Sequence, residues 1–211
     1  MVAGASGWSH RRVYRKHRRR RNEQPGGDAQ AAVEPANPRL PATFHKLRPM
    51  PPAPLQHVET LATPYYATLL LADEDADAVD SDLAAASREN VVACDGYQMY
   101  IGSQQADIPV RVVVAVWPDD PHRGVEAWDG EVVTTLFCRT GHFLLREMAG
   151  GVPGDWQLPA TGRYDVRLRW RNREITEQAA HGGTPVLDDA AFHGLEEYCV
   201  DMWLSADQEE E

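Results

Sequence analysis

The sequence predicts a mainly all-β protein, an antiparallel β-sandwich or open barrel of about eight strands, preceded by a disordered N-terminal arm. Two observations predict it. Short apolar runs rich in strand-forming residues recur between turn residues from about residue 58 onward, and no long amphipathic helical pattern interrupts them. A composition of 43% hydrophobic and 25% charged residues among 211 excludes a collagen-like, coiled-coil or wholly disordered chain.

The first expected elements lie between residues 65 and 101. Residues 65–71 form a compact apolar run whose length suits a strand better than a helix. The acidic stretch that follows is expected to be a loop, and residues 83–90 to form two helical turns. Residues 91–94 and 97–101 flank Asp95–Gly96, which is the strongest two-residue hairpin signal in the chain.

The next expected strands lie between residues 109 and 147. Residues 109–117 are dense in valine on both faces, which predicts a central strand buried on both sides. Residues 131–137 and 142–147 are joined across residues 139–141, a link of hairpin length. We therefore expect these two segments to pair as a hairpin.

The last expected strands are residues 163–171 and 197–204. The first of them alternates apolar and charged residues over nine positions, which indicates a half-buried antiparallel strand. Residues 149–162 and 172–194 are expected to be connections, because they are rich in glycine, proline or polar residues.

The charge of the chain is divided between two parts. Residues 1–57 hold 11 Lys/Arg and three Asp/Glu, whereas residues 58–211 hold ten Arg, no Lys and 29 Asp/Glu. The net charges are therefore +8 and −19. We expect a disordered arm over residues 1–57, basic and then proline-rich, an acidic β-sandwich domain over residues 58–206 and an acidic tail over residues 207–211.

The arm allows three interpretations. Clustered basic residues suit phosphate contacts, so the arm predicts an alternative role in nucleic-acid binding. It is otherwise a solvated tail, or it is absent if translation begins at Met50. The candidate nucleic-acid-binding residues are Arg11, Arg12, Arg15, Lys16, Arg18, Arg19, Arg20 and Arg21.

An acidic run follows the first expected strand and predicts a partner-binding surface. Six of its ten residues are carboxylates, which favour fast association with a basic groove; a solvated loop is the other interpretation. Their spacing does not match a calcium-binding EF-hand loop. The candidate partner-binding residues are Asp73, Glu74, Asp75, Asp77, Asp80 and Asp82.

The alternating strand predicts a basic stripe of Arg163, Arg167, Arg169 and Arg171. Arginine binds phosphate and carboxylate groups through paired hydrogen bonds, so this stripe is a candidate anion site. Because the surrounding domain is strongly acidic, ion pairing with neighbouring strands is the favoured interpretation.

The sequence gives no specific sign of a metal, cofactor or catalytic site. The domain histidines and the three cysteines show no ligand spacing, and no nucleophile motif or phosphate-binding loop is present. The apolar runs are too short to span a bilayer. We therefore expect no metal, no cofactor and no membrane association, and the possibility of an enzyme with an unrecognised carboxylate site is kept as a second alternative.

Two short motifs carry a resemblance to known proteins. Residues 158–167 (LPATGRYDVR) and 197–204 (EYCVDMWL) resemble the penultimate and closing strands of small acidic β-rich proteins of actinobacteria. More distantly, the order of elements over about residues 60–205 is similar to that of the competence-associated nuclease inhibitors. The resemblance implies a β-sandwich and supplies no catalytic residues.

Together these features favour a cytoplasmic, non-catalytic interaction or inhibitor protein of the immunity-like kind. Its expected partner is a basic protein, such as a nuclease or toxin, bound through the acidic run. The first alternative is an adaptor that binds nucleic acid through the basic arm.

Overall fold

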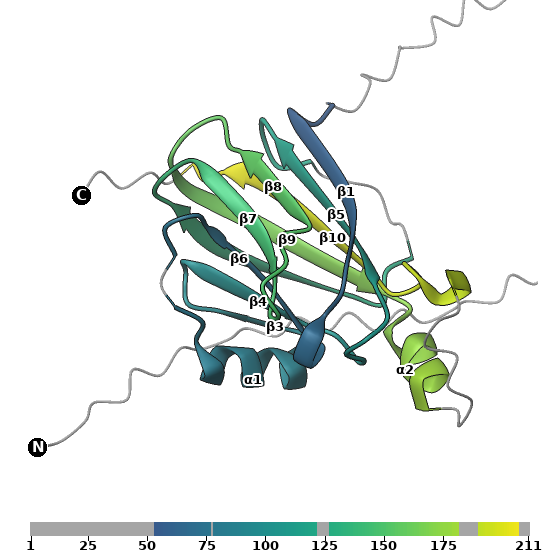
Figure 1. Cartoon of the computed structure of the whole chain (residues 1–211). Coiled ribbons are helices and arrows are strands. Elements are labelled where there is room, and N and C mark those ends of the chain that lie inside the picture. The colour runs from purple at the N-terminus through teal and green to yellow at the C-terminus, as the bar shows by residue number, and fades with distance from the viewer. Residues whose placement is uncertain (1–52, 77, 122–126, 182–189, 207–211) are drawn as a thin grey trace, which may run out of the picture. The chain divides into compact units, whose positions relative to one another are not determined.

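The computed structural model describes residues 53–206 except for residues 77, 122–126 and 182–189. Its ten strands form two sheets that pack face to face (Figure 1). Residues 1–52 of the expected arm and the acidic tail lie outside the described residues, so the predictions for them stay predictions, whereas Gln56 and His57 at the end of that arm belong to a strand.

The first sheet has five strands in the order β1-β5-β10-β9-β6. Neighbouring strands are antiparallel except β5 and β10, which are parallel. Because β10 lies between β5 and β9, strands distant in sequence form the middle of this sheet. The strands are β1 (Gln56–Ala62), β5 (Val110–Trp117), β10 (Glu197–Leu204), β9 (Gly162–Arg171) and β6 (Gly130–Cys138).

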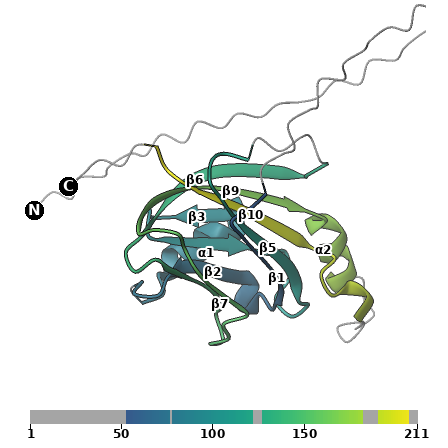
Figure 2. The ribbon, with the colours of Figure 1, turned by 90° about the horizontal axis from the view of Figure 1, so that it is seen from above.

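The second sheet has the order β3-β4-β2-β7-β8, and all its neighbours are antiparallel. Each sheet has two ends and no pairing closes one sheet onto the other, so the fold is an open sandwich and not a barrel, as the two layers of Figure 2 show. Its strands are β3 (Val92–Cys94), β4 (Gln98–Gly102), β2 (Thr68–Asp73), β7 (His142–Glu147) and β8 (Gly154–Gln157).

The core lies between the two sheets and follows from alternation along the strands. Val112 and Val114 of β5 and Leu168 of β9 face Leu71 of β2 and Phe143 of β7, and all five are fully or nearly fully buried. Each such side chain contributes about 1.5–3 kcal/mol of burial free energy. The predicted central strand at residues 109–117 is confirmed as β5, which is flanked on both sides and buried on both faces.

Helix α1 (Ser81–Asn90) covers part of the outer face of the second sheet. It contains the two helical turns that the sequence predicts over residues 83–90, so this prediction is confirmed. Ala84 packs there with Leu70 and Tyr100. Gly102 permits this approach, since a Cβ atom at that position would lie 2.2 Å from the backbone oxygen of Ser87.

Several details differ from the sequence prediction. Residues 65–67 form a 3-10 turn, η1 (Tyr65–Ala67), because Tyr66 and Ala67 have positive φ, and β2 begins only at Thr68. Strands β1 and β8 were missed. The expected connection after residue 171 contains helix α2 (Arg173–His181) and the 3-10 turn η2 (Ala190–Phe192).

The predicted hairpin of residues 131–137 with 142–147 is wrong. These segments are β6 and β7, and they belong to different sheets. The link between them crosses the sandwich because Thr140 donates its backbone N–H and its hydroxyl to Asp73 at the end of β2.

Candidate protein-docking site

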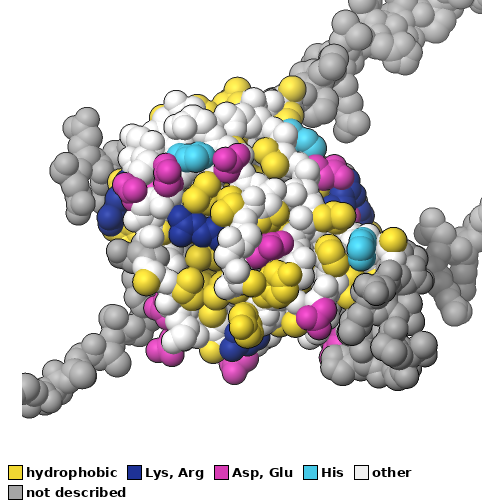
Figure 3. Space-filling view, viewed as in Figure 1, with side chains coloured by type: hydrophobic (Ala, Val, Ile, Leu, Met, Phe, Trp, Pro, Cys, Tyr) yellow, Lys and Arg dark blue, Asp and Glu magenta, His cyan; other side chains and the backbone are white. Residues whose placement is uncertain are grey.

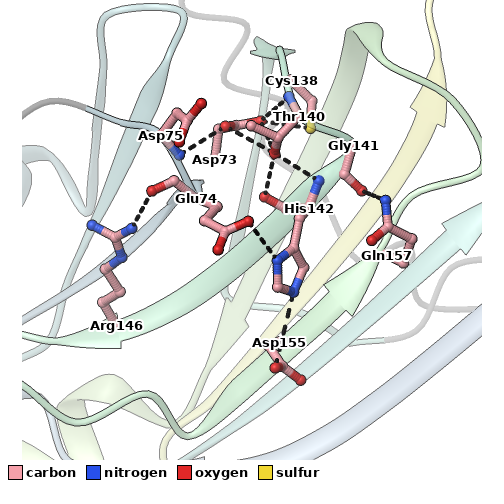
Figure 4. Close-up of polar contacts among 10 residues, drawn as sticks. All are labelled: Asp73, Glu74, Asp75, Cys138, Thr140, Gly141, His142, Arg146, Asp155 and Gln157. Carbon is pink, nitrogen blue, oxygen red and sulfur yellow. Dashed lines mark hydrogen bonds and ion pairs between the residues drawn. The ribbon is translucent and has the colours of Figure 1, made fainter.

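The acidic run begins at the end of β2, where Asp73 is buried (Figure 4). Its carboxylate accepts hydrogen bonds from Thr140 N at 3.0 Å, Thr140 Oγ1 at 3.1 Å, Asp75 N at 3.0 Å and Cys138 Sγ at 2.9 Å. Asp73 therefore fixes the β6–β7 link to the second sheet, and its own oxygens are directed into the protein.

The pKa of Asp73 reflects these contacts. Burial opposes ionisation and raises the pKa, but the hydrogen bonds from Cys138, Thr140 and Asp75 outweigh burial and lower the pKa below its ordinary value. Asp73 is thus an ionised structural group that positions the two acidic residues after it.

Glu74 and Asp75 are exposed and begin the candidate docking surface. Glu74 Oε2 lies 3.0 Å from His142 Nδ1, and the Glu74 carbonyl accepts from Arg146 Nη2 at 2.9 Å. His142 Nε2 lies 3.9 Å from Asp155 Oδ2, so one imidazole stands between two carboxylates. We call Glu74, Asp75 and Asp155 the acidic corner.

In the space-filling view of Figure 3, acidic side chains lie on both sides of a histidine in the upper part of the molecule. Asp155 and His142 were not part of the predicted site. No local pattern marks them, because they reach the corner only through the pairing of β2 with β7 and of β7 with β8.

The other predicted partner-binding residues lie around the start of α1. Asp80 is the N-cap of this helix, and its Oδ1 accepts from Asp82 N at 2.8 Å and Leu83 N at 3.1 Å. Asp82 is exposed in the first turn. Asp77 lies outside the described residues. The exposed members of the predicted set are therefore Glu74, Asp75, Asp80 and Asp82, of which Asp80 also has a structural role.

The arginines of β9 face outward from the first sheet and contact acids on neighbouring segments. The guanidinium groups also lie against tryptophan rings: Arg167 is 5.1 Å from the Trp203 ring centroid and Arg171 is 4.9 Å from that of Trp128. The ion pairs are Arg167 with Asp120 at 2.9 Å, Arg169 with Asp201 at 2.5 Å and Arg171 with Glu197 at 2.6 Å. Ion pairing therefore engages Arg167, Arg169 and Arg171, and Arg163 lies exposed near the start of β9.

Two buried acid–base groups of the described residues, Cys138 and Glu196, have a raised pKa. Burial and the nearby Asp73 carboxylate raise the pKa of Cys138 to about 12, so its thiol stays protonated at neutral pH. Burial also raises the pKa of Glu196, which is only 1% exposed. Its carboxylate accepts hydrogen bonds from Ser103 Oγ at 2.9 Å and from the Tyr198 hydroxyl. Both groups are therefore held by hydrogen bonds inside the protein.

Two kinds of site have no sign in the described part of the chain. No group of three or more His, Cys, Asp or Glu residues there has the arrangement needed to hold a metal ion. None of the helices described has the length and apolarity that crossing a bilayer requires.

The fold and the corner together define an acidic, open β-sandwich. No protein-family model matches the sequence, and no curated protein sequence matches it. Among solved structures, ComJ from Bacillus subtilis, an inhibitor of the DNA-degrading activity of NucA, has a similar fold. It aligns with a TM-score of 0.51 and 10% identity over 72% of this chain and 97% of ComJ.

The product of crocagin biosynthetic gene J has a similar fold as well. Its TM-score is 0.51 at 12% identity, over 71% of this chain and 97% of that protein. At identities this low, the TM-scores establish a shared fold and nothing finer. The shared fold with ComJ confirms the predicted distant likeness to the competence-associated nuclease inhibitors.

Proposed function

We propose that this protein is a non-catalytic, inhibitor-type protein that docks on a basic protein partner through the acidic corner and Asp82. The observation that carries the proposal is the separation of charges within the sandwich. Arginines of the first sheet pair with acids of that sheet and its loops, whereas Glu74 and Asp75, which follow the end of β2, and Asp155 of β8 stay exposed on the second sheet. The exposed corner therefore offers negative charge to a partner.

A DNA-degrading enzyme is the kind of basic partner that we propose. Proteins that bind DNA present arginine and lysine to its phosphates, and exposed carboxylates are able to occupy the same positions. The fold shared with ComJ, whose described target is NucA, supports this choice. A cytoplasmic location is part of the proposal, since Cys94, Cys138 and Cys199 are all free, as is typical of a reducing compartment.

Electrostatic steering gives this proposal a kinetic signature. Charges at the rim of an interface raise the association rate, and salt screens them within about 10 Å at 0.1 M. We therefore expect association with the nuclease to slow as the salt concentration rises, with a smaller change in the dissociation rate.

The test measures DNA degradation by a panel of basic nucleases, including NucA, with and without the full chain. The panel also includes the basic proteins of the host that degrade DNA, separated by cation exchange. We expect inhibition of at least one nuclease, and inhibition of none would reject the proposal.

Charge variants locate the surface. The variant Glu74→Gln/Asp75→Asn/Asp82→Asn should slow association with the inhibited nuclease by about tenfold at low salt and lose most of its salt dependence. The variant Asp107→Asn/Asp119→Asn/Glu174→Gln removes the same charge from other exposed positions. If both variants slow association equally, net charge and not this surface is responsible.

The basic arm supports a second candidate, an adaptor that binds nucleic acid. Its eight basic residues between Arg11 and Arg21 predict salt-dependent binding with little sequence preference. Removal of residues 1–24 should abolish retention on DNA or RNA, and retention without them would reject this role.

A further inference from the structure

An exposed aromatic cluster lies beside the acidic corner. The rings of Tyr97 and Phe137 meet edge to face, with centroids 6.1 Å apart and an interplanar angle of 84°. Arg139 Cζ lies 4.8 Å from the Tyr97 ring centroid. Tyr97 is 45% exposed and Phe137 is 40% exposed, so both rings are open to a partner. We call Tyr97, Phe137 and Arg139 the aromatic platform.

The backbone holds this platform in place. Asp95 Oδ1 accepts from Tyr97 N at 2.7 Å and from Gln98 N at 2.8 Å, which fixes the turn between β3 and β4. Phe137 N donates to Gly96 O at 2.7 Å and ties that turn to β6. Because the two sheets are joined at this point, the rings are arranged before any partner arrives, and binding loses little conformational entropy.

The β6–β7 link connects the platform to the acidic corner. Arg139 directly precedes Thr140, which donates to Asp73, and Asp73 directly precedes Glu74. The exposed carboxylate of Asp95 lies in the turn beside Tyr97. Aromatic and arginine side chains surrounded by charged residues are typical of the centre of a protein–protein interface.

We propose that the Tyr97–Phe137 pair is the anchor of the docking surface and receives an apolar side chain of the basic protein partner. This inference rests on the proposed function, because the acidic residues around the platform select the partner's charge. Basic side chains around the inserted group would contact Glu74, Asp75 and Asp95. A single DNA strand is the competing occupant, since exposed aromatic rings also stack on bases, but these carboxylates repel phosphates.

The experiment uses the full chain and the nuclease of the panel that it inhibits most strongly. Tyr97→Ala and Phe137→Ala should each raise the dissociation constant by about 10- to 30-fold. The change should fall on the dissociation rate, because an anchor acts after contact, whereas the acidic triple variant changes the association rate. Tyr97→Phe should retain most of the affinity because it keeps the ring.

Tyr66→Ala is the matched control, because Tyr66 is 74% exposed and has no part in the platform. Each variant is first compared with the parent chain in thermal unfolding, so that a loss of fold is not counted as a loss of binding. Parent-like dissociation rates for Tyr97→Ala and Phe137→Ala would overturn the anchor and leave the proposed function standing. If no nuclease is inhibited by the parent chain, both fail together.

A 20-nucleotide single-stranded DNA probe separates the two occupants. We expect the chain that lacks residues 1–49 to bind it no more tightly than Tyr97→Ala in the same shortened chain. Tight binding that Tyr97→Ala removes would show that the platform is occupied by nucleic acid, and would overturn a protein occupant.

Discussion

The buried pair of Arg169 and Asp201 permits a quantitative prediction about stability. Arg169 Nη2 lies 2.5 Å from Asp201 Oδ2, and Trp117 Nε1 donates to Asp201 Oδ1 at 2.8 Å. The arginine side chain is 4% exposed and the aspartate is completely buried. Asp201→Asn removes the negative charge while keeping the shape of the side chain, so Arg169 becomes a buried cation that has lost its carboxylate partner.

The expected cost of this change is large. Removal of one partner from a buried ion pair typically destabilises a protein by about 3–5 kcal/mol, because the remaining charge cannot regain water. Arg169 Nε already has no hydrogen-bond partner among the described residues, and the contacts of the guanidinium with the Trp128 ring at 5.1 Å and with Cys199 Sγ at 3.6 Å carry no negative charge. Since single domains are stable by about 5–15 kcal/mol, Asp201→Asn should remove a substantial part of the free energy of unfolding.

Urea unfolding followed by tryptophan fluorescence and circular dichroism measures this loss. A double variant, Arg169→Met/Asp201→Leu, removes both charges and should be within about 1 kcal/mol of the parent or more stable. Glu59→Gln breaks the exposed ion pair with Arg111 and serves as the control, for which we expect no measurable change. A loss below about 1 kcal/mol for Asp201→Asn would refute the argument that Arg169 depends on this carboxylate.

Three further predictions concern the sandwich. Because the pKa of Asp73 is lowered in the folded state, the stability it adds is present above its unfolded pKa and is lost as the pH falls through the folded pKa. Asp73→Asn should therefore make the free energy of unfolding, measured by urea titration, depend less on pH in the acid range. An unchanged pH dependence would contradict this. Cys138, with a pKa of about 12, should react with iodoacetamide at pH 8 only after unfolding, which peptide mass mapping detects; rapid labelling of the native protein would disprove it. Gly102→Ala should cost about 2–3 kcal/mol in urea unfolding through its clash with α1, whereas Gly154→Ala, with ordinary contacts, should resemble the parent; equal effects would contradict the clash.

The sequence predicted the sandwich because most of its strands carry strong local signals. The valines of β5 and the alternation of β9 identify buried and half-buried strands directly. Strand β1 was missed because its inward positions include Thr60 and Ala62, which give a weak apolar alternation. Pairing across 80 or more residues, as between β5 and β10, leaves no trace in local spacing.

The candidate site was predictable only in part, for a related reason. The acidic run is visible in the sequence, but burial separates Asp73 from Glu74 although they are neighbours. Likewise, the regular alternation of β9 places Arg169 outward and does not reveal that Asp201 of β10 lies beside it. Which charge is structural and which is exposed depends on strands that are distant in the chain.

The position of β10 has a consequence for how the protein folds. Strands β5 and β9 both pair with β10 and not with each other, so the first sheet stays in two halves until the last described strand is in place. During synthesis, β1–β5 and β6–β9 emerge from the ribosome as separate antiparallel pairs, each with an unpaired edge. Completion of the sheet therefore requires closing a long loop, which is a slow step, and chaperone binding during synthesis would protect these edges until then.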